Sequence, residues 1–308
     1  MSKILVTGGA GFIGSNLVDR LIELQHEVIV IDNLSTGDIN NVNKKAYFYK
    51  TDLCNIVDTE LNLICKDVEF IFHMAALPNV QYSMENPLET FEPNLLSTIK
   101  ILETARTNKV KKVVYSGSCS CYGDALSFPT TEEESIKPLS PYALNKYQGE
   151  EYCRLYSKIY ELDTVVLRYF NVYGNRMTKT GAYKSVLSVF LQAYQEHQPF
   201  NIVNDGNQKR DFVHVSDVVD ANIKAMFRDS RMESPINIGC GENYSVNQIA
   251  DMFGADKKYG EKRIEPQLTL SDISKANQYL DWEPKIKLEE WVQEQLSCHI
   301  FKKKDEKF

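Results

Sequence analysis

The sequence predicts an α/β fold, in which a doubly wound parallel sheet is joined to a second, smaller α+β domain for the substrate. Three observations support this prediction. Short apolar strands alternate with helical patterns in the first half of the chain, a glycine-rich turn joins the first strand to the first helix, and beyond Asn171 the segments become shorter and richer in proline. Strands that are apolar throughout are typical of a parallel sheet with helices on both faces. We therefore expect domains at 1–172 and 173–308, with part of 213–240 returning to the first.

The expected elements follow from the spacing of apolar residues. Runs of four or five mainly apolar residues predict strands, and apolar residues spaced at the helical period predict helices. Right-handed crossovers between these parallel strands produce a doubly wound sheet. In chain order we expect strands at 3–7, 28–31, 46–49, 69–73, 112–115 and 164–168, and helices at 12–24, 87–108 and 142–160.

Composition argues against several classes of protein. The 308 residues include 35 Lys and Arg against 42 Asp and Glu, a net charge of −7 that disfavours a nucleic-acid binder. No apolar run is long enough to cross a bilayer, and the chain enters a strand at once, so we expect neither a membrane anchor nor a signal peptide. Seven scattered Cys and five unclustered His predict no disulfide framework and no metal site. We expect a cytoplasmic protein.

The turn after the first strand has the spacing of a dinucleotide site. Gly8, Gly11 and Gly14 permit a tight turn and the close approach of a pyrophosphate, which the N-terminus of the following helix would face, as in the Rossmann arrangement. Asp32 ends the second strand, where a carboxylate binds the ribose hydroxyls of adenosine and repels a 2′-phosphate. The pattern favours NAD over NADP. The alternative is an ordinary tight turn with a capping Asp.

A tyrosine and a lysine form the second candidate site. Ser140 and Pro141 are typical of a helix start, and Tyr142 and Lys146 then lie on one face of that helix. A neighbouring ammonium and a positive nicotinamide ring would lower the pKa of the phenol from about 10 and make it an acid or base. Tyr-x-x-x-Lys also occurs by chance. A serine-rich strand end at 116–123 strengthens the functional interpretation, because it would point into the same cleft.

Eight short segments of the chain form a recognisable set: 7–14 (TGGAGFIG), 32–37 (DNLSTG), 73–76 (HMAA), 141–146 (PYALNK), 168–174 (RYFNVYG), 181–183 (GAY), 210–214 (RDFVH) and 281–284 (DWEP). In this order they resemble the extended short-chain dehydrogenase/reductase family, and within it the UDP-glucose and UDP-N-acetylglucosamine 4-epimerases. The resemblance covers nearly the whole chain.

The resemblance implies roles for individual residues. Ser118 matches the catalytic Ser/Thr, Tyr142 the base and Lys146 its partner. The implied cofactor-binding residues are Gly8, Gly11, Phe12, Ile13, Gly14, Asp32, Asn33, Ser35, Thr36, Gly37, Asp52, Leu53, Ala75, Ala76, Asn94, Tyr142, Lys146 and Tyr169. The implied substrate-binding residues are Ser118, Asn171, Arg210, Arg263 and Thr269.

Some of these substrate assignments leave alternatives open. Asn171 and Arg210 would bind the diphosphate, although Arg210 could instead form an ion pair with Asp211 or Asp217. A further basic residue comes from the pair at 262–263, and the spacing does not decide which one. The resemblance also implies a homodimer formed through the helices at 87–108 and 142–160.

The strand-end residues favour one reaction over others in the family. Related dehydratases and decarboxylases carry an acidic residue beside the catalytic hydroxyl, whereas this chain has Ser118, Cys119 and Ser120. We therefore expect a 4-epimerase that acts on UDP-glucose and UDP-galactose through a transient 4-keto sugar. Alternatives are a UDP-glucuronate epimerase, a 4-ketoreductase or a non-catalytic dinucleotide-binding protein. A small residue at Thr269 and the GAY segment at 181–183 predict room for N-acetylated sugars, unless Thr269 is only a surface residue.

Two departures from the family pattern are expected to have local effects only. Asp281 stands where the family usually has Gly, which suggests a changed loop. Cys119 and Cys121 replace smaller residues or Val and are expected to pack as small apolar side chains.

Overall fold

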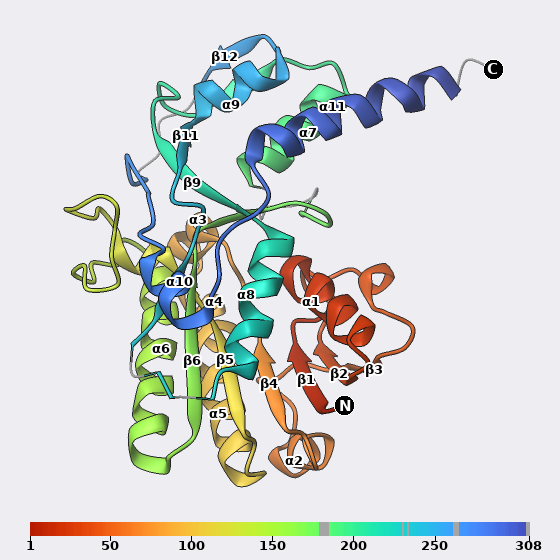
Figure 1. Ribbon diagram of the computed structural model, residues 1–308, viewed down its shortest axis with the longest axis vertical. Coiled ribbons are helices and arrows are strands. Elements are labelled where there is room, and N and C mark those ends of the chain that lie inside the picture. The colour runs from red at the N-terminus through yellow and green to blue at the C-terminus, as the bar shows by residue number, and fades with distance from the viewer. Residues whose placement is uncertain (179–184, 230, 233, 261–264, 306–308) are drawn as a thin grey trace.

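The computed structural model describes residues 1–308 except 179–184, 230, 233, 261–264 and 306–308. Its larger part is built on a seven-stranded sheet in which all neighbouring strands are parallel (Figure 1). The six strands expected from the sequence are all present, and a seventh comes from the second half of the chain. Across the sheet the order is β10 (Ile236–Ile238), β6 (Asp163–Tyr169), β5 (Lys112–Ser118), β4 (Phe70–His73), β1 (Lys3–Thr7), β2 (Glu27–Asp32) and β3 (Tyr47–Lys50).

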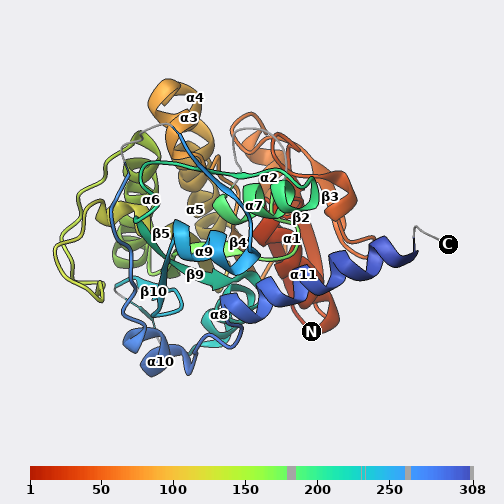
Figure 2. The ribbon, with the colours of Figure 1, turned by 90° about the horizontal axis from the view of Figure 1, so that it is seen from above.

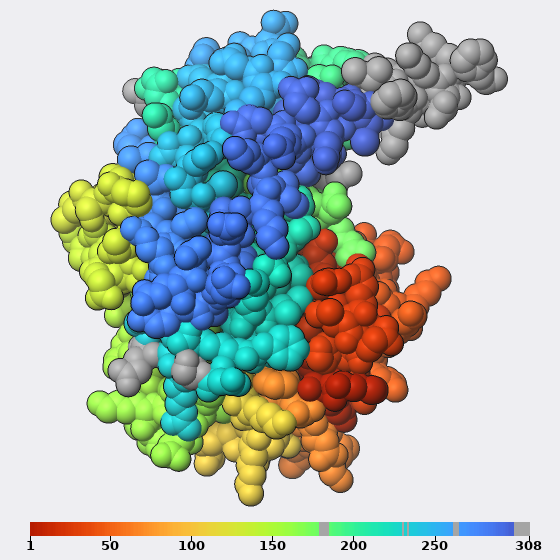
Figure 3. All heavy atoms as spheres, viewed as in Figure 1, coloured from red at the N-terminus to blue at the C-terminus, as the bar shows by residue number. Residues whose placement is uncertain are grey.

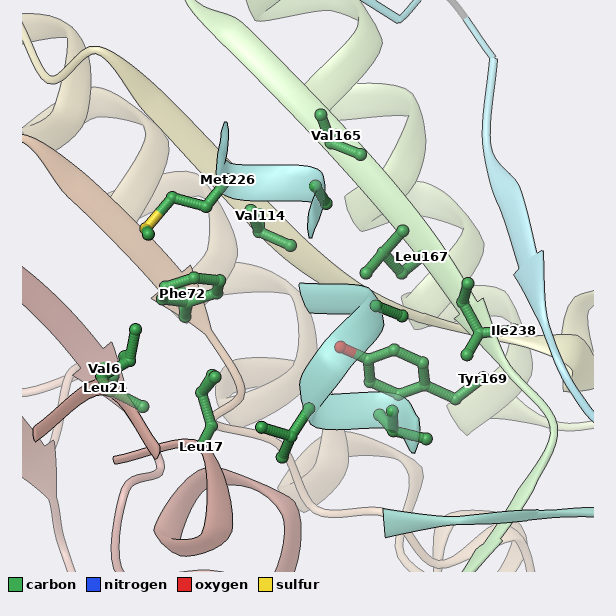
Figure 4. Packing of buried hydrophobic residues seen from close by; sticks show 14 of the residues in the cluster. Val6, Leu17, Leu21, Phe72, Val114, Val165, Leu167, Tyr169, Met226 and Ile238 are labelled. Carbon is green, nitrogen blue, oxygen red and sulfur yellow. The ribbon is translucent and has the colours of Figure 1, made fainter. Parts of the chain in front are cut away.

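Helices cover both faces of this sheet, which explains why its strands are apolar on both sides. Along β1, Ile4 packs with helices α1 (Phe12–Glu23) and α8 (Val215–Phe227), while Leu5 packs on the opposite face. Figure 4 shows the first face, where side chains of α1 and α8 lie against the strands. The opposite face is covered by α2 (Asp58–Ile64), α5 (Ser97–Thr107) and α6 (Pro141–Tyr160). The predicted doubly wound arrangement is confirmed.

The helix expected at 87–108 is interrupted. It consists of α4 (Pro87–Phe91), a π-helical turn over Glu92–Leu96 and then α5. Pro93 lies in the π turn and has no N–H to donate to the carbonyl four residues earlier, so the helix widens there. A short helix that the sequence analysis missed, α3 (Val80–Glu85), precedes it.

The smaller part lies over the carboxyl end of the large sheet (Figures 1 and 2). Its own core contains Tyr173, Phe190, Phe200 and Trp291. Figure 3 shows the second half of the chain covering the upper end of the molecule, with the segment near residue 130 projecting at one side. Its elements are β7 (Asn171–Tyr173), α7 (Val186–Gln195), β8 (Phe200–Ile202), β9 (Lys209–His214), β11 (Asn243–Ser245), α9 (Val246–Phe253), β12 (Lys257–Tyr259) and α11 (Leu288–Asp305).

The chain passes between the two parts more than once. After β9 in the smaller part it enters α8, which packs on the large sheet, and then β10, which pairs with β6. Helix α10 (Ser274–Leu280) contributes buried side chains to the same core. The smaller part, which covers the carboxyl ends of the strands, is therefore connected to the large sheet at several points along the chain.

A buried lysine fixes the C-terminal end of α8. Lys112 at the start of β5 is 3% exposed, and its Nζ donates to the carbonyl oxygens of Ala225 and Met226, both at 3.3 Å, and to that of Arg228. Asp163 lies 3.4 Å away and supplies a negative charge. The last carbonyls of a helix have no partner within the helix, and a cation at this end also interacts favourably with the helix dipole.

Replacement of Lys112 by Met should therefore lower the free energy of unfolding by roughly 2 kcal/mol, because hydrogen bonds to a charged group are lost and buried carbonyls are left without a donor. Urea denaturation measures this change. Lys111→Met is the matched control: the Lys111 side chain is 65% exposed and forms an ion pair with Glu69 at the surface, so its loss should change stability by less than about 0.5 kcal/mol. Equal stability of the two variants would contradict this role of Lys112.

Candidate active site

A cavity of about 450 Å³ opens at the carboxyl edge of the large sheet. Most of the residues that the sequence analysis selected line it. These are Gly8, Gly11, Phe12, Ile13, Gly14, Asp32, Asn33, Ser35, Thr36, Asp52, Leu53, Ala75, Ala76, Ser118, Tyr142, Lys146, Tyr169 and Asn171. Four others, Gly37, Asn94, Arg210 and Thr269, are not among the lining residues, and Arg263 lies outside the part of the chain that the structure describes.

The glycine-rich turn is shaped for an anion. Gly8 has φ +68°, and a Cβ there would lie 2.7 Å from the backbone N of Ala75; a Cβ at Gly14 would lie 2.2 Å from the Gly8 carbonyl oxygen. Both positions therefore require glycine. The N-cap of α1 is Gly11, which offers no side chain to the first helical N–H groups. These groups face the cavity and are suited to a pyrophosphate.

Asp32 is held at the end of β2 by two backbone donors. Its carboxylate oxygens accept from the N–H groups of Ala10 at 3.0 Å and Leu34 at 2.8 Å. Gly37 packs behind it, since a Cβ there would lie 3.1 Å from Asp32 Oδ1. Gly37 thus supports the carboxylate without reaching the cavity. A fixed carboxylate at this point can accept from the hydroxyls of a ribose.

Asn94, expected near the cofactor, is not among the residues that line the cavity. The side chain is buried in the π turn, where its Oδ1 accepts from the N–H of Leu77 at 2.8 Å and its Nδ2 donates to the Leu77 carbonyl at 3.3 Å. Because both of its polar atoms face the backbone at residue 77, Asn94 holds the segment that follows β4. That segment lines the cavity at residues 74–78.

Helix α6 brings Tyr142 and Lys146 to the cavity. It begins as expected, with Ser140 Oγ accepting from the N–H of Ala143 and Pro141 in the first turn. The N–H of Tyr142 donates to Ser83 Oγ at 3.1 Å, which ties this first turn to α3. Ser83 was missed because the sequence gives no sign that α3 exists.

The Tyr142 hydroxyl is close to the strand-end serine. Burial raises the pKa of Tyr142 to about 12, and a hydrogen bond with Ser118 partly offsets that rise. The Ser118 hydroxyl lies 2.8 Å from Ser120 Oγ and accepts from the Ser120 N–H at 3.2 Å. Ser120 also lines the cavity and was not selected from the sequence, although its spacing of two from Ser118 marks it as a neighbour.

Lys146 is buried among neutral groups. It is 3% exposed, its Nζ donates to Ser116 Oγ at 3.3 Å, and it lies 4.6 Å from the centre of the Tyr115 ring. Ser116 in turn donates to the backbone carbonyl of His73 at 2.9 Å. No carboxylate in the described part of the chain forms an ion pair with Lys146. Burial therefore lowers the pKa of Lys146 to about 7.

The candidate substrate residues meet around β9. Asn171 lines the cavity, and its Nδ2 donates to the Asp211 carbonyl at 2.8 Å and to Thr269 Oγ1 at 3.4 Å. Arg210 forms an ion pair with Glu265 at 2.6 Å, and not with Asp211 or Asp217. Thr269 is half-buried, and its Oγ1 accepts from the N–H of Asp211 at 3.1 Å.

The two unusual cysteines lie in different surroundings. Cys121 is 1% exposed and packs with Tyr122 and Phe170, as expected of a small apolar side chain, and burial raises its thiol pKa to about 12. Cys119 lines the cavity, and burial likewise raises its pKa. Neither thiol is activated.

Asp281 caps α10 at φ +48°, a left-handed conformation that explains why glycine suits this position.

The site's donors fit a dinucleotide better than a metal. The glycine turn, the N-terminus of α1, the Asp32 carboxylate, Lys146 and the hydroxyls of Ser118 and Tyr142 all line one cavity. Within the described residues, no group of three His, Cys, Asp or Glu could hold a metal ion. Across the same residues, no helix is both long and apolar enough to cross a membrane.

Comparison with known proteins shows the family of the chain. The family described as "NAD dependent epimerase/dehydratase family" matches residues 4–239. A protein of Methanocaldococcus jannaschii, provisionally named a UDP-glucose 4-epimerase, is 43% identical over 298 residues, which cover 94% of this chain and 95% of that protein.

Solved structures of similar proteins superpose over almost the whole chain. The UDP-glucose 4-epimerase of Thermotoga maritima with UDP-glucose has a TM-score of 0.91 and 36% identity, covering 98% of this chain and 99% of that one. The UDP-N-acetylglucosamine 4-epimerase of Methanobrevibacter ruminantium, in complex with UDP-N-acetylmuramic acid, has a TM-score of 0.90 and 34% identity with the same coverage. The UDP-glucuronic acid 4-epimerase of Bacillus cereus with UDP-glucuronic acid and NAD has a TM-score of 0.88 and 30% identity, covering 96% and 98%.

The glycine turn, Asp32 and the pair Tyr142 and Lys146 stand in one cavity, and the family match extends over most of the chain. The chain therefore belongs to the NAD-dependent epimerase/dehydratase family.

Proposed function

We propose that the protein catalyses the 4-epimerisation of a UDP-hexose, interconverting UDP-glucose and UDP-galactose and also accepting the N-acetylated pair. The observation that carries this proposal is the placement of Ser118, Tyr142 and Lys146 in the cavity that also holds the glycine turn. Among the described residues that line the cavity, the only carboxylates are Asp32, the last residue of β2, and Asp52, which follows β3. The strand order separates both from β5 and Ser118, so no acidic side chain stands ready for an elimination.

The chain's own residues supply the proton chemistry. Tyr142, as the phenolate, takes the proton of the sugar 4-hydroxyl, and Ser118 hydrogen-bonds to the same oxygen. When bound, NAD accepts the hydride from C4 and later returns it. The resulting 4-keto sugar turns about its link to the diphosphate and presents its other face. Tyr142 then gives its proton back to the 4-oxygen. Protons and electrons balance, and the net reaction is an isomerisation.

Lys146 makes this role of Tyr142 possible. A buried phenol resists ionisation, and a cation beside it favours the charged form. Because Lys146 is held by Ser116 and the Tyr115 ring, its charge is not cancelled by a carboxylate. The Lys146 ammonium has three N–H donors, and those that Ser116 does not use would donate to the ribose of the cofactor. Asn171 and Arg210 are proposed to hold the diphosphate, with Arg210 exchanging Glu265 for a phosphate oxygen.

Two alternatives within the family differ in what they consume or bind. A 4-ketoreductase would use NAD(P)H stoichiometrically, whereas an epimerase regenerates its cofactor. A UDP-glucuronate epimerase would need donors for the sugar carboxylate. Incubation with UDP-glucose, UDP-N-acetylglucosamine and UDP-glucuronate, followed by separation of products, distinguishes the three. A protein that only senses dinucleotide would convert none of them.

We further propose that the protein is a cytoplasmic homodimer. Apolar side chains on α4 and α6 support a dimer, because Leu88 is 84% exposed and Ile159 56% exposed, with Phe91 and Leu155 also exposed. Large exposed apolar residues gathered on a helix pair are typical of an interface.

Replacement of Tyr142 by Phe should leave folding and cofactor content intact and lower turnover by about 10²-fold or more, the usual scale for loss of a general acid or base. The variant removes one hydroxyl and keeps the ring, so packing is preserved. Epimerisation rates and the released nucleotide are measured together. Near-normal turnover in the variant would refute the role of Tyr142.

The purified protein should contain NAD and not NADP. The Asp32 carboxylate is fixed by the N–H groups of Ala10 and Leu34 where the adenosine ribose is expected, and it would repel a 2′-phosphate. Denaturation of the protein and chromatography of the released nucleotide test this expectation. Recovery of NADP as the main nucleotide would contradict it.

A bulky residue at position 269 should exclude N-acetylated sugars. We expect Thr269→Tyr to lose activity on UDP-N-acetylglucosamine at least ~10-fold more than on UDP-glucose, because the added ring clashes with the acetamido group. The measurement is epimerisation of both sugars by each variant.

Thr269→Val is the matched control for this change. Thr269 Oγ1 accepts from the N–H of Asp211 at 3.1 Å, and both Tyr and Val at this position remove that hydrogen bond. Val removes the hydroxyl at nearly constant volume and should affect both sugars in equal proportion. If Thr269→Tyr also affects both equally, or if the wild type never accepts UDP-N-acetylglucosamine, position 269 does not set sugar size.

A further inference from the structure

We propose that Asp211, a residue of β9 that does not reach the cavity, is the positioning residue that sets the sugar-nucleotide end of the site. This inference rests on the proposed function, because it assumes that the residues around Asp211 hold a UDP-sugar. The new element is that one buried carboxylate holds these residues in place.

The Asp211 side chain joins two separate segments of the chain. It is 0% exposed, and its Oδ1 accepts from the N–H of Cys240 at 2.6 Å. Its Oδ2 accepts from the N–H of Gly241 at 3.1 Å and from both the N–H and the hydroxyl of Ser271, at 2.9 and 2.5 Å. Four donors on one buried carboxylate are sufficient to keep it in place without a cationic partner.

The surrounding backbone is fitted closely to this carboxylate. A Cβ at Gly239 would lie 2.9 Å from Asp211 Oδ2 and 2.3 Å from Ser271 Oγ. Position 239 therefore accepts only glycine while Asp211 and Ser271 stay where they are. Because β10 ends at Ile238, the same contact fixes how the chain leaves the large sheet and approaches β9.

The backbone of Asp211 touches the candidate substrate residues. Its N–H donates to Thr269 Oγ1 at 3.1 Å, and its carbonyl accepts from Asn171 Nδ2 at 2.8 Å. Arg210 is the preceding residue, and its guanidinium is paired with Glu265. One peptide thus meets residues from β7, from β9 and from the segment at 265–271. Displacement of Asp211 would shift all three of the candidate contacts to the UDP-sugar together.

Asp211→Asn tests this arrangement with almost no change in shape. An amide has one acceptor oxygen and one donor NH₂, so one of the two carboxylate positions must then face N–H groups with a donor. The orientation of the Asn side chain that loses fewer hydrogen bonds places its NH₂ opposite the N–H of Cys240. Its oxygen then stands where Oδ2 was and still accepts from the same three donors. The expected result is a shift of the loop at 239–241 rather than unfolding.

A second buried aspartate provides the matched control. Asp217 on α8 is 4% exposed, and its Oδ2 accepts from the backbone N–H of Ile286 at 3.0 Å. Burial raises the pKa of both carboxyl groups. Asp217 forms its hydrogen bonds with residues 282–286, which are not among the candidate substrate residues. Asp217→Asn therefore reproduces the cost of losing a buried carboxylate without disturbing the sugar-nucleotide end.

The experiment is isothermal titration of wild type, Asp211→Asn and Asp217→Asn with UDP, together with thermal unfolding and the NAD content of each protein. We expect the affinity for UDP to fall about 10-fold in Asp211→Asn, equivalent to ~1.4 kcal/mol, and to stay within about 2-fold of wild type in Asp217→Asn. The NAD content should be the same in all three. If Asp211→Asn does not fold, Ser271→Ala, which removes one donor to Oδ2 and keeps the backbone donors, should lower UDP affinity by ~3-fold.

The results distinguish failure of the proposed role of Asp211 from failure of the proposed function. Wild-type affinity for UDP in a folded Asp211→Asn protein, or an equal loss in Asp211→Asn and Asp217→Asn, would overturn the role of Asp211 and leave the proposed function standing. Failure of the wild-type protein itself to bind UDP would refute the proposed function and, with it, this inference.

Discussion

The buried ammonium of Lys146 determines how the reactive end of the cavity is built. Its partners are neutral, Ser116 Oγ at 3.3 Å and the Tyr115 ring at 4.6 Å, so its charge is not cancelled. Burial of an unpaired cation is unfavourable and lowers the pKa of Lys146 to about 7. Tyr142 and Lys146 line the same cavity. We propose that this buried cation favours the phenolate that the proposed reaction needs.

The two ends of the cavity are built in different ways. The dinucleotide end depends on backbone, since Gly8 and Gly14 leave no room for side chains and the N-terminus of α1 supplies N–H groups. The proposed sugar end depends on side chains from several segments, and the carboxylate of Asp211 hydrogen-bonds to two of these segments. The first arrangement lies within one strand, turn and helix. The second exists only when distant parts of the chain have packed, which is why the two ends should respond differently to mutation.

This difference also explains how much could be predicted from the sequence. The strands of the large sheet, the glycine turn, Asp32 and the pair Tyr142 and Lys146 lie in local patterns, and the structure brings these groups to one cavity. Contacts between segments could not be predicted in this way. Glu265 as the partner of Arg210 lies 55 residues away, and Ser271, a donor to Asp211, lies 60 residues away. The hydrogen bonds of Asn94 to the backbone at residue 77, 17 residues away, are another contact of this kind.

The central claim is that Tyr142 ionises readily in the assembled site. A direct test is an ultraviolet difference titration of the NAD-bound protein, in which the absorbance of phenolate in wild type is compared with that in Tyr142→Phe. In the protein alone, burial raises the pKa of Tyr142 to about 12. With NAD bound, we predict one phenolate that appears well below pH ~10, the ordinary range of tyrosine, and is missing in the variant. Identical titrations of the two proteins below pH ~10 would contradict the account.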